Sequence, residues 1–313
     1  MVQSSATGTA LRIGSRGSPL ALAQAHEVRD RLAAVHGFEA AAIEVCAIRT
    51  SGDRIQDRTL ADIGGKGLFT KEIEEALRDG AIDLAVHSAK DMPTILADDL
   101  ALAAFLRRED ARDAFISRIA GTLGELAAGS VVGTASLRRQ ALIKRLRPDL
   151  AVTPLRGNVD TRLRKLDEGV VDATLLALAG LKRLGRAAAA TAVMSLDDFP
   201  PAVGQGAIAI EVRADDTRAH TLLAAIDDED TATALAAERA FLAVLDGSCR
   251  TPIAGHAIVT DGAVAFRGMI LNPDGSEAHE TRRRGSRAEA AALGADAGRE
   301  LKARAPANFF AHG

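Results

Sequence analysis

The chain has 313 residues, 47% of them hydrophobic and 26% charged, with a formal net charge of −3, which is typical of two or three globular domains and excludes a disordered chain. The polar residues 1–10 and the shortness of every apolar run predict neither a secretory signal nor a membrane-spanning helix, and two cysteines alone favour a cytoplasmic protein. Trp and Tyr are absent, which disfavours single-stranded nucleic acid as a partner because bases stack on aromatic side chains.

The first part of the chain predicts an α/β unit. A strand at 11–13 runs into a turn that contains Arg16, and Ser18 is a natural N-cap for a helix that Gly37 closes. The other apolar runs of this unit predict strands at 43–48, 82–86 and 100–105 and a helix at 68–78. The polar, Gly-rich segment 50–67 predicts a mobile loop beside the site.

Lys90 and Asp91 follow the strand at 82–86, at the carboxyl end where α/β sheets usually bind ligands. Asp91 has two interpretations: a structural ion pair, or the acid of an anion site that stabilises a developing cation or moves a proton. The residues alone do not choose between them. No histidine has metal-ligand spacing, so no metal site is predicted.

A strongly basic stretch at 138–165 forms a second candidate site. It holds nine basic residues against two acidic ones in a chain that is acidic overall, which favours one anion site over a nucleic-acid surface. Ser136 is the natural N-cap of a helix at 137–146. Arg138 and Arg139 therefore lie in its first turn, where the helix dipole disfavours cations. An anion held by both guanidinium groups and the free N–H groups would offset this penalty.

The arrangement recurs at Arg156 and Arg162, because Asn158 is a natural N-cap for the next helix. We interpret these two arginines, like Arg138 and Arg139, as ligand-binding. Two such junctions, with the one near Ser18, imply two similar α/β units whose helix N-termini face a common cleft. The other basic residues of the stretch are interpreted as a solvated face: Lys144, Arg145, Arg147, Arg164 and Lys165.

The remainder predicts a second α/β unit, a return to the first, and a small α+β domain. Two lobes with a double hinge are expected, because the chain leaves one unit, builds another and comes back. The predicted elements are strands at 113–117, 131–133, 173–177 and 207–212, helices at 178–185, 231–245 and 287–303, and three C-terminal strands separated by Asp261-Gly262 and Asp274-Gly275.

The two cysteines lie in different settings. Cys46 belongs to the apolar strand at 43–48, where an inert core thiol is expected. Cys249 lies in a loop beside Arg250, where a more exposed and more ionised thiol is expected. A lone cysteine of this kind is otherwise an incidental surface thiol.

The chain resembles the hydroxymethylbilane synthase family, also called porphobilinogen deaminase, in several segments that follow the family's order. They are SRGSPLALAQ, GGKGLFTKEIE, DLAVHSAKDMP, GTASLRRQ, LRGNVDTRL, LAGLKRLG, AVGQGAIAIE and GSCRTPI. The resemblance runs from Leu11 to the final helix. The sequence departs from the family's usual pattern at Ala89, Ala135 and Ser248, and none of these changes removes a charged or nucleophilic group.

This resemblance implies an enzyme of tetrapyrrole (heme) synthesis that joins four porphobilinogen molecules head to tail, releases ammonia at each addition and hydrolyses the product to hydroxymethylbilane. It implies a dipyrromethane cofactor joined to Cys249 as a thioether, and Asp91 as the catalytic residue. The residues implied to bind substrate and cofactor are Arg16, Ser18, Gln24, Lys90, Thr134, Ser136, Arg138, Arg139, Arg156, Arg162, Arg183 and Gln205.

The resemblance also implies two periplasmic-binding-protein-like α/β lobes with a hinge and a small C-terminal α+β domain with a three-stranded antiparallel sheet. The expected domains are 8–106 with 207–226, then 107–206 with the basic anion site, then 227–313 with the cofactor cysteine. A cytoplasmic monomer is expected, with porphobilinogen as its partner and neither nucleic acid nor membrane.

A different class of function fits part of this pattern. Two hinged lobes with helix N-termini facing a cleft also describe anion-binding and ligand-sensing proteins, which do no chemistry. The expected absence of a signal peptide argues against a periplasmic carrier, and Cys249 would have no role in one. A nucleic-acid-binding protein is a more distant third alternative.

Overall fold

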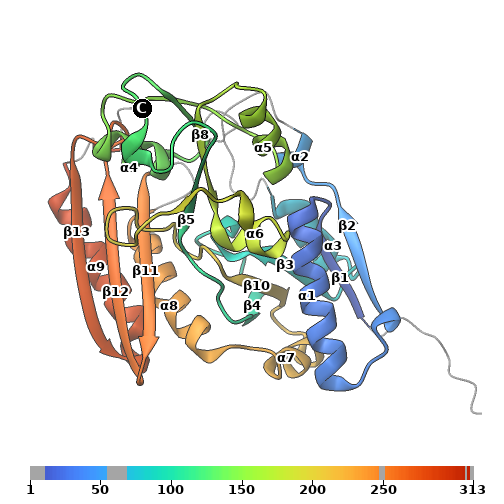
Figure 1. The fold of residues 1–313 in the computed structure, drawn as a ribbon. Helices are drawn as coiled ribbons and strands as arrows, with labels where there is room; N and C mark the ends of the chain where they lie inside the picture. Colours follow the sequence, from blue (N-terminus) through green and yellow to red (C-terminus); the bar gives the residue numbers. More distant parts are fainter. Residues whose placement is uncertain (1–10, 55–68, 247–250, 307–308, 311–313) are drawn as a thin grey trace, which may run out of the picture.

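The computed structural model describes residues 11–54, 69–246, 251–306 and 309–310. These residues form two α/β lobes and a small C-terminal domain, whose three-stranded sheet stands along one side of the molecule (Figure 1). The predicted fold class is confirmed, including the antiparallel C-terminal sheet. No helix among the described residues is long and apolar enough to cross a membrane.

Lobe 1 is built on a five-stranded sheet in the order β2-β1-β3-β10-β4. Its strands are β1 Leu11–Arg16, β2 Ile43–Ile48, β3 Leu84–Ser88, β4 Leu100–Phe105 and β10 Ile208–Arg213. β1 pairs parallel with β2 and β3, whereas β10 pairs antiparallel with β3 and β4. The helices and 3-10 turns of this lobe are α1 Pro19–His36, η1 Ala40–Ala42, α2 Ser51–Arg54, α3 Lys71–Arg78, η2 Ala89–Asp91 and α7 Thr217–Ala224.

Lobe 2 has the same plan, with a five-stranded sheet in the order β7-β6-β8-β5-β9. Its strands are β5 Asp113–Ser117, β6 Val131–Gly133, β7 Ala151–Thr153, β8 Ala173–Ala177 and β9 Ala192–Val193. β6 pairs parallel with β7 and β8, and β5 pairs antiparallel with β8 and β9. The helices and 3-10 turns are η3 Leu123–Glu125, α4 Leu137–Leu146, α5 Val159–Asp167, α6 Leu178–Arg183 and η4 Ala187–Ala189.

Each lobe receives its antiparallel strand from a chain segment that has just crossed from the other lobe. β5 follows the first crossover, at 106–112, and β10 follows the second, at 194–207. In each lobe the remaining four strands run in one direction, so their carboxyl ends lie at one edge of the sheet. The two crossovers pass between these edges and connect the lobes.

The C-terminal domain consists of a three-stranded sheet and two long helices. Gly294 on the second helix permits a close approach to the first, because a Cβ there would lie 1.9 Å from the carbonyl oxygen of Ala237. Met269 and Leu271 belong to the same buried cluster as Leu142 of α4, so this domain shares a core with lobe 2. Its elements are α8 Glu229–Val244, β11 Ile253–Thr260, β12 Ala263–Leu271, β13 Ala278–Ser286, η5 Arg287–Glu289 and α9 Ala290–Arg304.

Most predicted elements are confirmed, and the differences lie at their ends. The strand expected at 11–13 continues to Arg16, since Ser15 is fully buried and its hydroxyl donates to the carbonyls of Ala21 and Val86. The helix expected at 68–78 begins at Lys71, and the strand expected at 82–86 lies at Leu84–Ser88. Within the expected loop at 50–67, residues 51–54 form α2 and residues 55–67 lie outside the described residues.

Candidate active site

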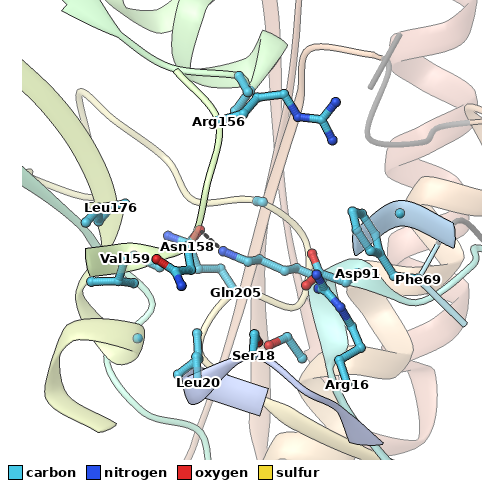
Figure 2. Close-up of a pocket in the computed structure, with 18 of the residues that line it drawn as sticks. Arg16, Ser18, Leu20, Phe69, Asp91, Arg156, Asn158, Val159, Leu176 and Gln205 are labelled. Carbon is cyan, nitrogen blue, oxygen red and sulfur yellow. Dashed lines mark hydrogen bonds between the residues drawn. The ribbon is translucent and has the colours of Figure 1, made fainter. Parts of the chain in front are cut away.

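A cleft of about 790 Å³ lies where the two lobes and the C-terminal domain meet. It is lined by residues that follow β1, β3, β6 and β7, by Ala202, Val203 and Gln205 of the second crossover, and by residues of α8 and β11. Figure 2 shows Arg16, Asp91 and Arg156 approaching this space from different elements. The cleft therefore lies at the carboxyl ends of strands from both lobes, where α/β folds usually bind ligands.

Three helix N-termini open onto this cleft. Ser18, Ser136 and Asn158 cap α1, α4 and α5, each accepting a hydrogen bond from the backbone N–H three residues on, at 3.3, 3.4 and 2.8 Å. All three N-caps are confirmed. The free N–H groups and the dipole of each helix favour a negative charge in the cleft.

Arg138 and Arg139 lie in the first turn of α4, and both are buried. They hold a carboxylate of the protein itself: Nη2 of Arg138 lies 2.7 Å from Oδ2 of Asp113, and Nη2 of Arg139 lies 2.7 Å from Oδ1. Burial by itself would raise the pKa of Asp113, but the two guanidinium charges outweigh it and lower that pKa. This buried carboxylate compensates one of the two positive charges at the helix start.

Lys90 and Asp91 lie in η2, directly after β3, and both line the cleft. Nζ of Lys90 lies 3.5 Å from Oε1 of Gln205, and Nε2 of Gln205 donates to Asp113 at 3.0 Å. Gln205 thereby links lobe 1 to the carboxylate of lobe 2. Burial lowers the pKa of Lys90 to about 8, because the charge of Asp91 only partly offsets the lost hydration.

Three further arginines line the cleft. Arg16 lies over the ring of Phe69, with 4.1 Å between the guanidinium carbon and the ring centroid. Burial, together with the neighbouring charges of Arg139 and Arg156, lowers the pKa of Arg162 to about 10. A carboxylate bound beside Arg162 would relieve the repulsion between these cations.

Gln24 and Thr134 do not line the main cleft among the described residues. Gln24 exchanges hydrogen bonds with Ser88, at 2.9 and 3.1 Å, and lines a smaller cavity of about 60 Å³ that Asp91 also lines. The hydroxyl of Thr134 accepts from the backbone N–H of Ser136 at 3.2 Å. Both residues thus stand behind residues that line the cleft.

Arg183 also lies away from the described lining of the cleft. Its guanidinium pairs with Glu27 of α1 at 3.3 Å and donates to the carbonyl of Gly206 at 3.1 Å. The structure therefore places Arg183 between α1, α6 and the second crossover, where it links the lobes.

Cys249 lies outside the described residues, while Thr251 and Ile253, which follow it in the sequence, line the cleft. Cys46 has a free thiol and is half-buried, not fully buried as expected of a core residue. It lies on β2, an edge strand of the lobe 1 sheet. Burial raises the pKa of its thiol, which keeps it protonated and poorly nucleophilic. Among the described residues, no group of three His, Cys, Asp or Glu side chains is placed to hold a metal ion.

Two buried acids that contact the crossovers, Asp113 and Glu238, were not predicted as site residues from the sequence. Glu238 accepts from the guanidinium of Arg108 at 2.5 Å and from the backbone N–H of Gly204 at 2.7 Å, so it supports the crossover beside Gln205. Each acid interrupts an apolar pattern, at the start of the strand 113–117 and within the apolar stripe of α8. Because a buried charge needs a partner, an acid at an apolar position of the pattern indicates a buried ion pair, and this feature of the sequence could have identified both residues.

Among solved structures, the fold is similar to the methionine binding protein MetQ, with a TM-score of 0.44 at 16% identity, covering 71% of this chain and 91% of that one. A periplasmic substrate-binding protein of an ABC transporter from Coxiella burnetii gives a TM-score of 0.43 at 15% identity, covering 69% of this chain and 91% of that one. Likeness at this level has no bearing on what the chain binds.

Two family models match most of the chain. "Porphobilinogen deaminase, dipyromethane cofactor binding domain" matches residues 11–221, and "Porphobilinogen deaminase, C-terminal domain" matches residues 232–303. Proteins named porphobilinogen deaminase from Nitrobacter winogradskyi and Nitrobacter hamburgensis are each 62% identical over 310 residues, which is 99% of this chain and 98% of theirs. The first model also confirms the dipyrromethane cofactor expected of the chain. The chain therefore belongs to the porphobilinogen deaminase family of transferases.

Proposed function

We propose that the protein is a hydroxymethylbilane synthase, which condenses four porphobilinogen molecules head to tail with loss of ammonia and hydrolyses the product to hydroxymethylbilane. One observation carries this proposal beyond family membership. Asp91 lines a single cleft together with basic residues from both lobes: Arg16, Lys90, Arg138, Arg139, Arg156 and Arg162. One acid among many cations in the described part of the cleft suits a substrate with several carboxylates and a reaction that develops positive charge.

The basic residues are proposed to hold the acetate and propionate groups of the pyrroles. Guanidinium groups match carboxylates with two parallel N–H donors, and the three capped helix N-termini add backbone donors. Arg156 and Arg162 come from the start of α5, and Arg16 from the end of β1, so carboxylates on opposite sides of a pyrrole chain find donors in different lobes. Gln24, Thr134 and Arg183 do not line the described part of the main cleft, and they are proposed to hold the residues that line it in position.

The cleft fits a dipyrromethane joined to Cys249. Thr251 and Ile253, which follow Cys249 in the sequence, line it, and the donors described above match the several carboxylates that such a group carries. Nε of Arg138 is buried without a hydrogen-bond partner among the described residues, so a carboxylate there would satisfy it. When bound, this group supplies the pyrrole carbon to which the first substrate is joined.

Asp91 is proposed as the catalytic residue. Loss of ammonia from porphobilinogen leaves a cationic azafulvene, and a fixed carboxylate near its nitrogen lowers the energy of that charge as it develops. The carboxyl group of Asp91 is proposed to give its proton to the departing amine, and the carboxylate that this leaves is proposed to accept the proton lost from the ring carbon. Lys90, its neighbour in η2, would hold a carboxylate of the substrate beside it.

The domains are proposed to be 8–106 with 207–226, then 107–206, then 227–313, with the two crossovers as the hinge. The sheets follow these ranges, since β10 completes the sheet of lobe 1 and β5 to β9 lie within the second range. Motion about the crossovers would make room as the chain of pyrroles grows. A cytoplasmic monomer remains the expectation for the intact protein.

The first experiment is an intact mass of the purified protein with a peptide map around Cys249. The expected result is the added mass of two linked, deaminated pyrroles on Cys249, absent from Cys249→Ser. Incubation with porphobilinogen should then release ammonia and give hydroxymethylbilane. A protein that binds porphobilinogen but neither gains mass at Cys249 nor releases ammonia is a binding protein, and the proposed function would be wrong.

A further inference from the structure

Asp113 is fully buried at the first position of β5, where the first crossover ends. Its carboxylate accepts hydrogen bonds from Arg138, Arg139 and Gln205, at 2.7, 2.7 and 3.0 Å. Both arginines are also buried, at 4% and 5% exposed. The cluster thus holds two cations and one anion and keeps a net charge of +1.

The two guanidinium groups retain donors for a further ligand. A guanidinium carries five N–H groups, and the hydrogen bonds described above and those to the carbonyls of Pro200 and Leu175 use two donor atoms of Arg138 and three of Arg139. Nε of Arg138 is buried with no hydrogen-bond partner within the described part of the chain. Both side chains line the cleft, so a carboxylate in it lies near two guanidinium groups that still have unused N–H groups.

The charge of the cluster decides how tightly such a carboxylate is held. Two adjacent buried cations without a counter-ion would be strongly destabilised, and an external carboxylate that supplied the missing charge would be bound tightly. With Asp113 present, one of the two charges is already compensated, so an external carboxylate gains less by binding. Weaker binding matters for the proposed reaction, because the carboxylates of a growing chain must leave these donors between additions.

We propose that Asp113 is a positioning residue that fixes the guanidinium groups of Arg138 and Arg139 and limits the affinity of the cleft for carboxylates. The assignment of pyrrole carboxylates as the ligand rests on the proposed function. The charge balance of the cluster does not, because it follows from three side chains of this protein. The two parts can therefore be tested separately.

The charge balance is tested with Asp113→Asn, a double variant Asp113→Asn/Arg138→Gln that restores the net charge of +1, and the control Asp110→Asn. Asp110 lies in the same crossover and pairs with Arg112 at 2.6 Å, so the control removes a carboxylate from an ion pair outside the cluster. Succinate is titrated at constant ionic strength against the melting temperature of the protein as purified. Asp113→Asn is expected to bind succinate about tenfold more tightly than the parent, and Asp110→Asn about as the parent does. The double variant is expected to lose that tenfold gain, because it has neither the extra positive charge nor the donors of Arg138.

Unchanged succinate affinity in a folded Asp113→Asn variant would overturn the proposal. If that variant does not fold, the double variant decides: folding that is restored by the removal of one cation supports a role through charge. A double variant that fails to fold, or that binds succinate tenfold more tightly, shows that Asp113 acts through shape and overturns the proposal.

The kinetic part is tested by adding limiting porphobilinogen and measuring, by mass, how many units remain bound to the protein. Asp113→Asn is expected to lower KM and kcat together, each by about tenfold, and to accumulate partly extended chains. A fall in kcat with unchanged KM and no accumulation would count against a limit on affinity. Absence of turnover in the parent protein would refute the proposed function and leave the succinate result to decide the role of Asp113.

Discussion

Arg108 and Glu238 form a buried ion pair, with 2.5 Å between Nη1 of the guanidinium and Oε1 of the carboxylate. Glu238 is fully buried and also accepts from the backbone N–H groups of Gly204 and Ala257, each at 2.7 Å. Arg108 belongs to the first crossover, Gly204 to the second, and Ala257 to β11. One carboxylate therefore ties both connections between the lobes to the C-terminal sheet.

Glu238→Gln is expected to lower the free energy of unfolding by about 3 kcal/mol, because it leaves the guanidinium of Arg108 buried without its counter-charge. Urea unfolding measures this loss. Asp167→Asn is the control, since it breaks the exposed pair between Arg118 and Asp167 and should change the free energy of unfolding by less than about 1 kcal/mol. Similar small losses for both variants would mean that Glu238 does not hold the crossovers together.

Asp91→Asn is expected to reduce turnover of porphobilinogen by at least about 100-fold, since an amide neither stabilises a developing cation nor transfers a proton. Its thermal unfolding should match that of the parent. The control is Asp98→Asn, which changes an exposed aspartate nearby in the sequence. Ammonia release in a stopped assay gives the rate, and near-normal release by Asp91→Asn would remove this residue from the mechanism.

The lowered pKa of Lys90 predicts opposite effects of pH on stability and on binding. Between pH 8 and 10.5 the folded protein holds fewer protons on Lys90 than the unfolded chain does, so Lys90 makes stability rise with pH across that window. Affinity for carboxylates should fall as pH rises through about 8, because Lys90 then loses its charge. Melting temperature and KM, followed from pH 7 to 10, measure the two effects.

Lys90→Met isolates this contribution, because it removes the titrating amine and keeps the length of the side chain. The pH dependence that remains in Lys90→Met belongs to other groups, such as the Cys46 thiol. Identical pH profiles for KM in Lys90→Met and the parent would contradict a role of the Lys90 charge in binding.

Gly206→Ala is expected to destabilise the protein by about 3 kcal/mol. Gly206 has a φ of 92°, and a Cβ there would lie 2.4 Å from the carbonyl oxygen of Glu109 in the other crossover, so backbone strain adds to a clash. Gly129→Ala is the matched control, with a φ of 81° but open space around the added carbon, and should cost about 1 kcal/mol. Equal losses of unfolding free energy in Gly206→Ala and Gly129→Ala would show that the backbone of the crossovers shifts to accommodate the added Cβ, and would contradict the prediction.

The features that were predictable from the sequence are those that short-range chemistry decides. Ser18, Ser136 and Asn158 each cap a helix through a backbone group three residues away, so the pattern is visible in a few letters. The location of Lys90 and Asp91 at the end of a buried strand follows in the same way from local hydrophobicity. These local features placed most of the residues of the cleft.

The features that were not predictable depend on which strands become neighbours. Asp113 meets Arg138 and Arg139 because β5 inserts antiparallel beside β8, and no local pattern fixes that pairing. Arg183 was expected at the cleft, yet the short helix α6 directs it toward Glu27 of α1. Such contacts depend on how the two lobes pack, and the periodicity of apolar residues in a helix or strand does not predict that packing.

The insertion of β10 into lobe 1 also bears on how the chain folds while it is made. All strands of lobe 2 lie between residues 113 and 193, whereas lobe 1 lacks the strand between β3 and β4 until residues 208–213 have emerged from the ribosome. Lobe 2 is therefore expected to complete its sheet first, although its sequence comes second. Until then the facing edges of β3 and β4 are open, and a nascent chain halted near residue 200 would expose them as templates for aggregation.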